Sequence, residues 1–111
     1  MSDIKNNVGD KIVAFPLVDK DGTNVLFTSA SEAIIQFTNK GGRFITKTKT
    51  DNEVVEGDEP NYFEVELQES ETLLLGKEEL TVYIEVTLTD ATFSDGEATS
   101  NTAVKLKLWD V

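Results

Sequence analysis

The sequence predicts an all-β fold, namely an immunoglobulin-like antiparallel β-sandwich of about seven strands with at most one short helical turn. Three observations support this prediction. Apolar and polar residues alternate with a period of two in several runs of the 111-residue chain, which indicates half-buried strands. Clusters of Asp, Gly and Pro separate these runs, where turns are expected. The strand-like runs recur roughly every 8–15 residues, a spacing that is typical of sandwiches and too short for βαβ units.

The clearest predicted strand is Glu79–Thr89, in which every second residue is aliphatic and the residues between are polar. This pattern is typical of an antiparallel strand with one buried face. Tyr62–Leu67 and Ala103–Trp109 repeat the pattern. The remaining predicted strands are Lys11–Val18, Ser31–Asn39 and Arg43–Thr50.

The aliphatic faces of these strands are predicted to form the core. The predicted core residues are Ile12, Ile35, Phe37, Phe63, Val65, Leu67, Leu80, Val82, Ile84, Val86, Leu88, Val104, Leu106 and Leu108. Pro16 cannot donate a ladder hydrogen bond, so the first of the strands is expected at a sheet edge or broken by a bulge. Gln68–Leu75 is the one segment predicted to be helical, as a single turn that crosses between the sheets and is capped by Ser70.

The length fits one domain. We expect residues 9–111 to form this single domain and residues 1–8 to be a flexible N-terminus. No linker, internal repeat or low-complexity stretch divides the chain.

The composition argues against most catalytic chemistry. The chain has no Cys and no His, which excludes disulfides, thiolate nucleophiles, cysteine zinc sites and imidazole bases. We therefore expect a protein that is not an enzyme and that uses no cofactor or metal. Its formal charge of -11 disfavours nucleic acids and anionic membranes as partners.

The charge is unevenly distributed along the chain. Acidic residues dominate Glu53–Glu79, whereas Lys40–Lys49 contains Arg43, Lys47 and Lys49 and no acid. One interpretation is that both stretches are ordinary solvated strand faces. The other is an asymmetric surface that docks against a complementary neighbour, with the three basic residues as interface candidates.

Two groups of acids resemble parts of known binding or catalytic sites. Asp19 and Asp21 resemble the start of a calcium loop, but the twelfth position of such a loop is Ala30 rather than Glu, so a tight turn is expected. The acids in Glu56–Glu59 share one loop, where they are expected to be solvated rather than to form a glycosidase pair.

Three aromatic residues are predicted to lie on outward faces of three strands, namely Tyr62, Tyr83 and Trp109. Exposed aromatic side chains can stack on sugars or anchor a protein interface. The alternative is that they pack on cross-strand neighbours. Trp109 is of interest because a terminal strand is often an edge strand that can recruit a partner.

The order of several segments resembles the N-terminal immunoglobulin-like domain of bacteriophage upper baseplate proteins and related small tail modules. The segments that carry this resemblance are Gly9-Asp10, Val18–Val25, Ala33–Phe37, Phe63–Leu67, Ser70–Leu73 with Gly76, Leu80–Thr89, Asp95–Thr99 and Val104–Leu108. Together they cover nearly the whole chain, from about Gly9 to Trp109.

The resemblance implies a virion structural protein, made in the bacterial host cytoplasm, that docks onto other phage tail or baseplate proteins without catalysis. Members of that family commonly continue into helices and a distal domain, and no such continuation follows Val111 here. Trimerisation is therefore not carried over, and a small head-decoration or tail-completion protein is an alternative. A homo-oligomer is possible. The alternative from another functional class is a carbohydrate-binding or adhesive sandwich that uses surface aromatic residues.

Overall fold

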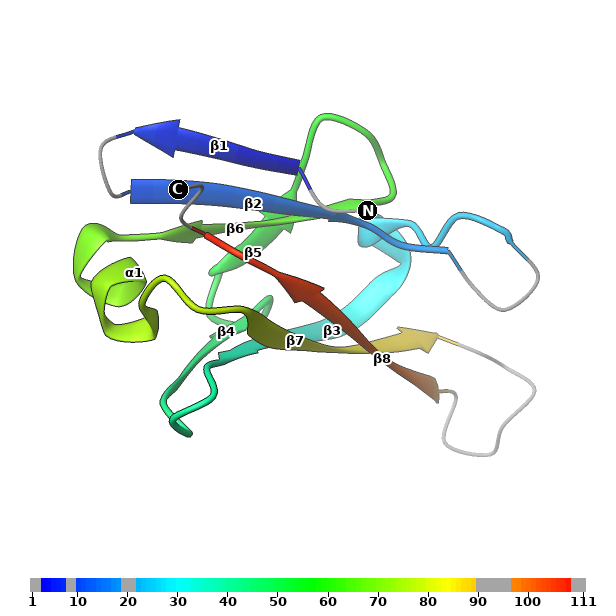
Figure 1. Ribbon diagram of the computed structural model, residues 1–111. Helices are drawn as coiled ribbons and strands as arrows, with labels where there is room; N and C mark the ends of the chain where they lie inside the picture. Colours follow the sequence, from blue (N-terminus) through cyan, green and yellow to red (C-terminus); the bar gives the residue numbers. More distant parts are fainter. Residues whose placement is uncertain (1–2, 8–9, 19–21, 90–96, 109–111) are drawn as a thin grey trace.

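The alternating runs of the sequence form two sheets of four strands each in the computed structural model, which describes residues 3–7, 10–18, 22–89 and 97–108. The strands are β1 (Asp3–Asn7), β2 (Asp10–Pro16), β3 (Ala30–Thr38), β4 (Phe44–Thr48), β5 (Val54–Glu56), β6 (Tyr62–Leu67), β7 (Leu80–Thr89) and β8 (Glu97–Leu106). A 3-10 turn, η1 (Phe27–Ser29), precedes β3, and a short helix, α1 (Glu69–Leu75), joins β6 to β7. Figure 1 shows the two sheets stacked as layers.

The strand order confirms the predicted immunoglobulin-like sandwich. One sheet has the order β1-β2-β6-β5 and the other the order β4-β3-β7-β8, and all pairings are antiparallel. Labelled A to G in chain order, these sheets are ABED and C′CFG, which is the connectivity of the immunoglobulin fold. The chain thus crosses repeatedly between the layers, and the core lies between them.

Two strands were not predicted. β1 lies in the segment that we expected to be a flexible N-terminus, and it pairs with β2 from Asp3 opposite Ala14 to Asn7 opposite Asp10. β5 has only three residues, Val54–Glu56, which pair with β6. Both are short strands at sheet edges. A run of 5 or 3 residues is too short to show a clear alternation of apolar and polar residues, so the sequence alone does not indicate either strand.

The core confirms the inward residues predicted for β3, β6 and most of β7. Phe15 and Phe37 meet across the two sheets with their ring centroids 6.0 Å apart. Buried hydrophobic residues are Val13, Ala14, Phe15, Ala30, Ala33, Ile35, Phe37, Val54, Phe63, Val65, Leu67, Leu75, Leu80, Val82, Ile84, Val86 and Leu108. Leu88, Val104 and Leu106 are only partly buried and pack against this cluster.

The prediction of Ile12 as a core residue is wrong. β2 pairs Val13 with Val65 and Phe15 with Phe63, so these residues face the core, while Ile12 pairs with Glu66 on the opposite side. Adjacent apolar residues at positions 12 and 13 left the inward set of β2 ambiguous, and a shift by one residue exchanges the two faces of a strand.

Pro16 does not mark an edge strand, because β2 lies between β1 and β6. It is the last residue of β2 and pairs with Tyr62 of β6, whereas the described pairing with β1 ends at Ala14. The missing N–H group therefore falls where the strand ends, and the sheet needs no bulge to accommodate it.

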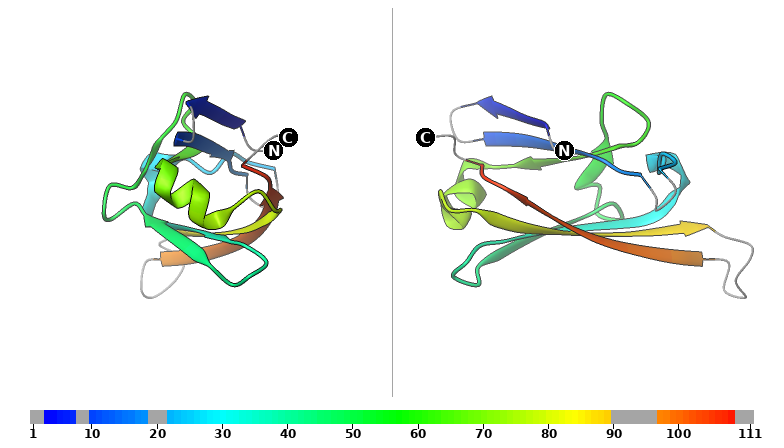
Figure 2. Two further views of the ribbon diagram at one scale, coloured as in Figure 1. Left: turned by 60° about the vertical axis from the view of Figure 1, so that its left-hand side comes forward. Right: turned by 45° about the vertical axis from the view of Figure 1, so that its right-hand side comes forward.

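Helix α1 closes one end of the sandwich, as both views in Figure 2 show. Its N-terminal cap is Gln68 rather than the predicted Ser70, because the Gln68 and Glu71 side chains form a reciprocal capping box. Thr72 and Leu75 are the helix residues that are fully buried. Gly76 ends the helix with φ of 81°, a left-handed conformation that glycine adopts without strain.

Candidate functional site

The outer face of the sheet β4-β3-β7-β8 carries the most exposed aromatic surface of the described residues. In the register of this sheet, Gln36 lies between Thr46 and Tyr83, and Tyr83 lies opposite Ala103. One row further along, Glu85 lies between Ile34 and Asn101. We call this surface the Tyr83 face; it comprises Ile34, Gln36, Phe44, Thr46, Tyr83, Glu85, Asn101 and Ala103.

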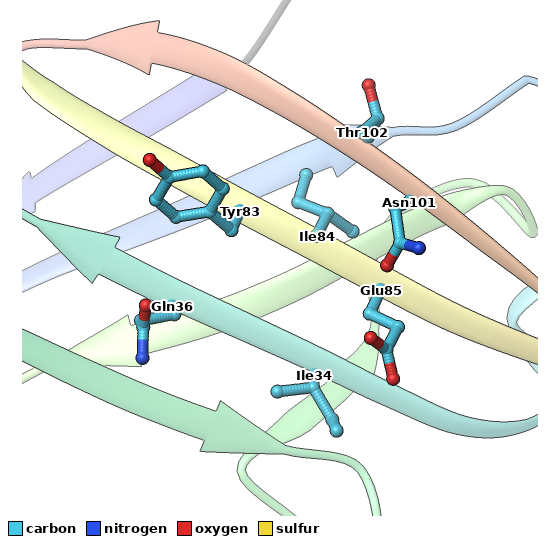
Figure 3. Close-up of a pocket in the computed structure, with 7 residues that line it drawn as sticks. All are labelled: Ile34, Gln36, Tyr83, Ile84, Glu85, Asn101 and Thr102. Atoms are coloured by element: carbon cyan, nitrogen blue, oxygen red, sulfur yellow. The ribbon is translucent and has the colours of Figure 1, made fainter.

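Tyr83 stands near the middle of this face with 51% of its surface exposed, and Phe44 at the start of β4 is 58% exposed. A shallow depression of about 300 Å³ lies between the strands, lined by Ile34, Gln36, Tyr83, Ile84, Glu85, Asn101 and Thr102. Figure 3 shows the Tyr83 ring and the Gln36 amide at one end of the depression and Ile34, Glu85 and Asn101 at the other.

Polar groups of the Tyr83 face are partly held in place by their neighbours. The Gln36 amide donates to the Thr46 hydroxyl oxygen at 3.3 Å and accepts from the Thr38 hydroxyl at 3.4 Å. Within the described part of the chain, the Tyr83 hydroxyl makes no hydrogen bond, so it is available to a partner. The face therefore combines exposed aromatic rings with oriented amide and hydroxyl groups.

Charge is sparse on this face although the chain as a whole carries -11. Glu85 lies within it and Lys105 of β8 lies at its border, in the same cross-strand row as Phe44, while the surrounding strand positions are mainly Thr, Gln and Asn. The centres of protein interfaces are likewise depleted in charge and enriched in Tyr and Phe, with polar groups at the rim. The arrangement thus suits a contact surface better than a site that must bind a charged ligand.

The other aromatic candidates do not join this surface. Tyr62 is half-buried at the start of β6, in the first sheet, and a Cβ atom at Gly57 would approach the Tyr62 Cβ to 2.8 Å. That close approach shows that Tyr62 is packed against the loop before β6. Trp109 lies outside the described residues.

Lys47 is mainly a structural residue. It lies opposite Ile35, on the side of β4 that faces the sandwich, and its side chain is 13% exposed. Its Nζ atom lies 2.8 Å from Glu71 Oε2 and 3.9 Å from Glu53 Oε2. Glu71 also accepts the Gln68 N–H through its Oε1 atom at 3.0 Å, so this ion pair fastens β4 to the capped start of α1.

Lys49 is also engaged within the molecule. Its Nζ donates to the Phe27 carbonyl at 2.9 Å and to the Ala30 carbonyl, and it lies 4.2 Å from the centroid of the Phe27 ring. These contacts satisfy the carbonyls of η1 and its C-terminal cap, aided by a cation–π contact. Of the three basic candidates, Arg43 is the exposed one, in the turn between β3 and β4.

Glu32 completes the same edge of the sandwich. Its carboxylate accepts the Thr50 hydroxyl, the Thr50 N–H at 3.1 Å and the Ala33 N–H at 2.9 Å. The Thr50 hydroxyl bond is the main cause that lowers the pKa of this carboxyl, and burial opposes it. Glu32 lies at the register shift between Ala30 and Glu32 in β3, so it ties that irregularity to the turn after β4. We call Glu32, Lys47, Lys49, Glu53 and Glu71 the β4 edge cluster.

The acidic stretch is divided between this cluster and the first sheet. Glu64 and Glu66 lie on the outer side of β6, beside a hollow of about 410 Å³ that Ile12, Val55 and Glu53 also line. Glu56, Asp58 and Glu59 are exposed in or next to the loop before β6. The acidic stretch Glu53–Glu79 and the basic stretch Lys40–Lys49 therefore do not form two separate charged surfaces, because Lys47 of the basic stretch is paired with Glu53 and Glu71 of the acidic one.

Metal and membrane sites find no support in the described residues. There the structure brings together no group of three or more His, Cys, Asp or Glu residues suited to a metal ion. Asp19 and Asp21, considered as calcium ligands, lie outside the described residues. No helix in the described ranges is long and apolar enough to cross a membrane.

Comparisons with known proteins identify no relative: no family model, no curated protein and no solved structure matches the chain. The Tyr83 face is therefore assigned as the candidate site on its geometry alone. Sequence reasoning found Tyr83 but missed Phe44, Ile34 and Gln36. Phe44 had a usable signal, since it is a large aromatic residue that begins a run of Thr and Lys; Ile34 and Gln36 were recognisable only through their strand neighbours.

Proposed function

We propose that this protein is a non-enzymatic docking module that binds another protein through the Tyr83 face. The observation that carries the proposal is the exposed aromatic surface of Tyr83 and Phe44, which has few charged neighbours in a strongly acidic chain. Aromatic anchors surrounded by satisfied polar groups are the usual content of interface centres. The absence of Cys and His from the sequence agrees with a role in contact rather than chemistry.

The class of partner comes from the sequence resemblance. It supports a phage virion structural protein, a tail or baseplate component, whose partners are other tail or baseplate proteins. The immunoglobulin-like strand order is compatible with that assignment, and it is shared by many unrelated proteins. The virion is accordingly the proposed location.

Direct binding tests the docking proposal. The purified chain is titrated against each co-encoded tail or baseplate protein by isothermal calorimetry, and one of them is expected to bind at the Tyr83 face. Tyr83→Ala should weaken that binding about thirtyfold, the loss of a typical anchor residue. Val55→Ala is the matched control, because Val55 is an exposed hydrophobic residue on the other sheet. Equal effects of the two variants would refute the Tyr83 face as the docking surface.

The virion assignment has its own test. Phage particles are induced from the strain that carries the gene, purified on a density gradient and analysed by peptide mass spectrometry. The chain is expected in intact particles at a fixed ratio to known tail proteins. Its absence from purified particles would contradict the assignment, whatever the binding experiment shows.

Carbohydrate binding is the second candidate, favoured by one feature of the same face. An exposed Tyr ring with the amides of Gln36 and Asn101 and the carboxylate of Glu85 around a shallow depression is a suitable arrangement for stacking on a sugar. A glycan array with the wild-type chain and Tyr83→Ala separates the two candidates. Signals that Tyr83→Ala abolishes would support this candidate over protein docking.

A further inference from the structure

The free edge of β8 is the longest unpaired strand edge in the described part of the molecule. The two sheets end in β1 and β5 and in β4 and β8. β1 and β4 have 5 residues each and β5 has 3, whereas β8 has 10. In the described part of the chain, β8 is hydrogen-bonded to β7 and to no other strand. An edge strand presents a row of unpaired N–H and C=O groups, so β8 offers the largest template for a further strand.

β8 also lacks the features by which proteins normally protect such an edge. Its pairing with β7 is continuous, with no register shift from Glu97 to Leu106. It contains no Pro, and its charged residues, Glu97 and Lys105, lie near the two ends. Lys, Pro and bulges are the usual devices that block edge-to-edge pairing. The middle of β8 carries none of them.

A partly apolar groove lies beside this edge. It has a volume of about 200 Å³ and is lined by Leu17, Val18 and Val25 from one layer and by Val86, Thr102 and Val104 from the other. Thr102 and Val104 belong to β8, so a strand added at its edge would direct every second side chain towards the groove. The edge and the groove therefore accept the same extended segment.

We propose that the occupant of this edge is β8 of a second copy of the chain, paired antiparallel about Asn101. With Asn101 opposite Asn101, position 97 lies opposite position 105 because the two are equally distant from 101. This register gives the acidic position 97 of each copy the basic position 105 of the other as its opposed partner. Directly opposed charges of opposite sign stabilise antiparallel pairs.

The rest of β8 is compatible with this register. The remaining opposed pairs are Ala98 with Val104, Thr99 with Ala103 and Ser100 with Thr102. All are small or β-branched, and none places a charge in the middle of the new ladder. In this register Thr102 and Val104, which line the groove, lie opposite positions 100 and 98.

The charges also disfavour other arrangements. A register centred on Ala103 places Lys105 opposite Asn101 and leaves Glu97 without an opposed base. A parallel pairing places Glu97 near Glu97 and Lys105 near Lys105, which is unfavourable. Lys105 already lies 3.9 Å from Glu79 Oε1 of its own chain, in an exposed pair that is weak and leaves the ammonium accessible. The antiparallel arrangement about Asn101 is the one that places the two charged positions of β8, 97 and 105, opposite each other.

This pairing would join two sheets across a twofold axis, as in most homodimers. The outer residues of one β8 lie opposite outer residues of the other, because 97, 99, 101, 103 and 105 pair among themselves. The result is a sheet of eight strands in which the two Tyr83 faces lie on the same side. Sheets of that size are within the usual range.

Cross-linking tests the register. The chain has no native Cys, so Asn101→Cys introduces a single thiol at the twofold axis, opposite its own copy. Under mild oxidation we expect rapid formation of a disulfide-linked dimer. Ala103→Cys is the matched control on the same strand and face; its two copies would be roughly 14 Å apart along the strands, too far for a disulfide. Equal cross-linking of both variants would overturn the proposal.

Charge exchange tests the recognition. Sedimentation equilibrium of the wild-type chain should show a dimer, and a monomer up to about 1 mM would overturn the proposal. Glu97→Lys and Lys105→Glu should each raise the dissociation constant about tenfold, since each change reverses two symmetric pairs. An equimolar mixture of the two variants should form a heterodimer of restored affinity, visible by native mass spectrometry. A dimer indifferent to both changes would form elsewhere and would also overturn the proposal.

This self-association is independent of the docking proposal. Tyr83→Ala should leave the dissociation constant of the dimer unchanged, whereas Glu97→Lys should still bind the tail partner through an intact Tyr83 face. Melting temperatures of all variants establish that each is folded. Failure of one proposal is therefore distinguishable from failure of the other.

Discussion

The Tyr83 face and the β4 edge cluster both involve the sheet β4-β3-β7-β8 and use their side chains in opposite ways. The Tyr83 face exposes aromatic rings and has few charges, namely Glu85 within it and Lys105 at its border. In the β4 edge cluster, Lys47 and Lys49 are tied to carboxylates and to backbone carbonyls. The charged side chains of the β4 edge cluster thus stabilise the fold, whereas the Tyr83 face, which has few charges, is the surface available to a partner.

This difference changes the meaning of the basic stretch. Its residues Lys47 and Lys49 were candidates for a docking interface because the sequence places no acid among them. In the folded chain, Glu53 and Glu71 form ion pairs with Lys47. The main-chain oxygens of Phe27 and Ala30 accept hydrogen bonds from the Lys49 ammonium.

The largest effect on stability is expected for Lys47→Ala. This change removes the partner of Glu71 at a mostly buried position, and breaking such a pair leaves a carboxylate without compensation. We expect a loss of about 2 kcal/mol in the free energy of unfolding, reduced from the fully buried case because Glu71 is partly exposed. Urea denaturation followed by circular dichroism measures it. Arg43→Ala, an exposed change in the adjacent turn, should have little effect; an equal loss would contradict a structural role of Lys47.

A smaller loss is expected for Lys49→Met. Methionine keeps much of the apolar stem that packs near Phe27 but cannot donate to the Phe27 and Ala30 carbonyls. The loss of these bonds and of the cation–π contact should cost about 1–2 kcal/mol. The same denaturation experiment applies, and Lys49→Arg should recover part of the loss because a guanidinium retains the charge and the donors. If Lys49→Met left the free energy of unfolding unchanged, Lys49 would have no stabilising role in the β4 edge cluster.

Glu32→Gln should cost about 1 kcal/mol at neutral pH, because the ionised carboxylate accepts three hydrogen bonds from Thr50 and Ala33. The pKa of Glu32 is lower in the folded chain than in the unfolded chain. The contribution of Glu32 to the free energy of unfolding is therefore fully present above the pKa that Glu32 has in the unfolded chain. It is lost as the pH falls through the pKa that Glu32 has in the folded chain. Unfolding curves from neutral pH into the acid range should show the two proteins converging at low pH. A difference independent of pH would contradict this explanation.

The smallest effect on stability is expected for Tyr83→Ala. Tyr83 is half-exposed on the outer face, so its truncation should change the free energy of unfolding by no more than about 0.5 kcal/mol. The same variant is expected to lose partner binding, which makes it the opposite of Lys47→Ala in both readouts. Thermal denaturation measures the stability, and a loss as large as that of Lys47→Ala would show that the two regions do not differ as described.

Much of the fold was predictable because strand patterns are local. Glu79–Thr89 alternates so regularly that its inward residues Val82 and Ile84 followed directly. Tyr62–Leu67 was predicted with the bounds that β6 has in the structure. β2 was harder, since Ile12 and Val13 are both apolar and only the pairing with β6 shows which of them is inward.

The candidate site was less predictable. An outward position for Tyr83 followed from the alternation in its strand, but nothing local indicated that Gln36 lies beside it or that Asn101 lies beside Glu85. These neighbours are set by strand order and register, which depend on contacts between distant parts of the chain. The pairing of Lys47 with Glu71 and Glu53 is of the same kind.

The sequence alone determined which residues alternate into a core and that the side chains lack thiol and imidazole chemistry, since periodicity and composition need no knowledge of neighbours. The tertiary structure decided where the charge of -11 acts. It brought the acids of the β4 edge cluster to the basic strand and left the Tyr83 face and the edge of β8 open. The physical reason is that electrostatic and hydrogen-bond partners are chosen by distance in space, and only the stacking and register of the two sheets establish that distance.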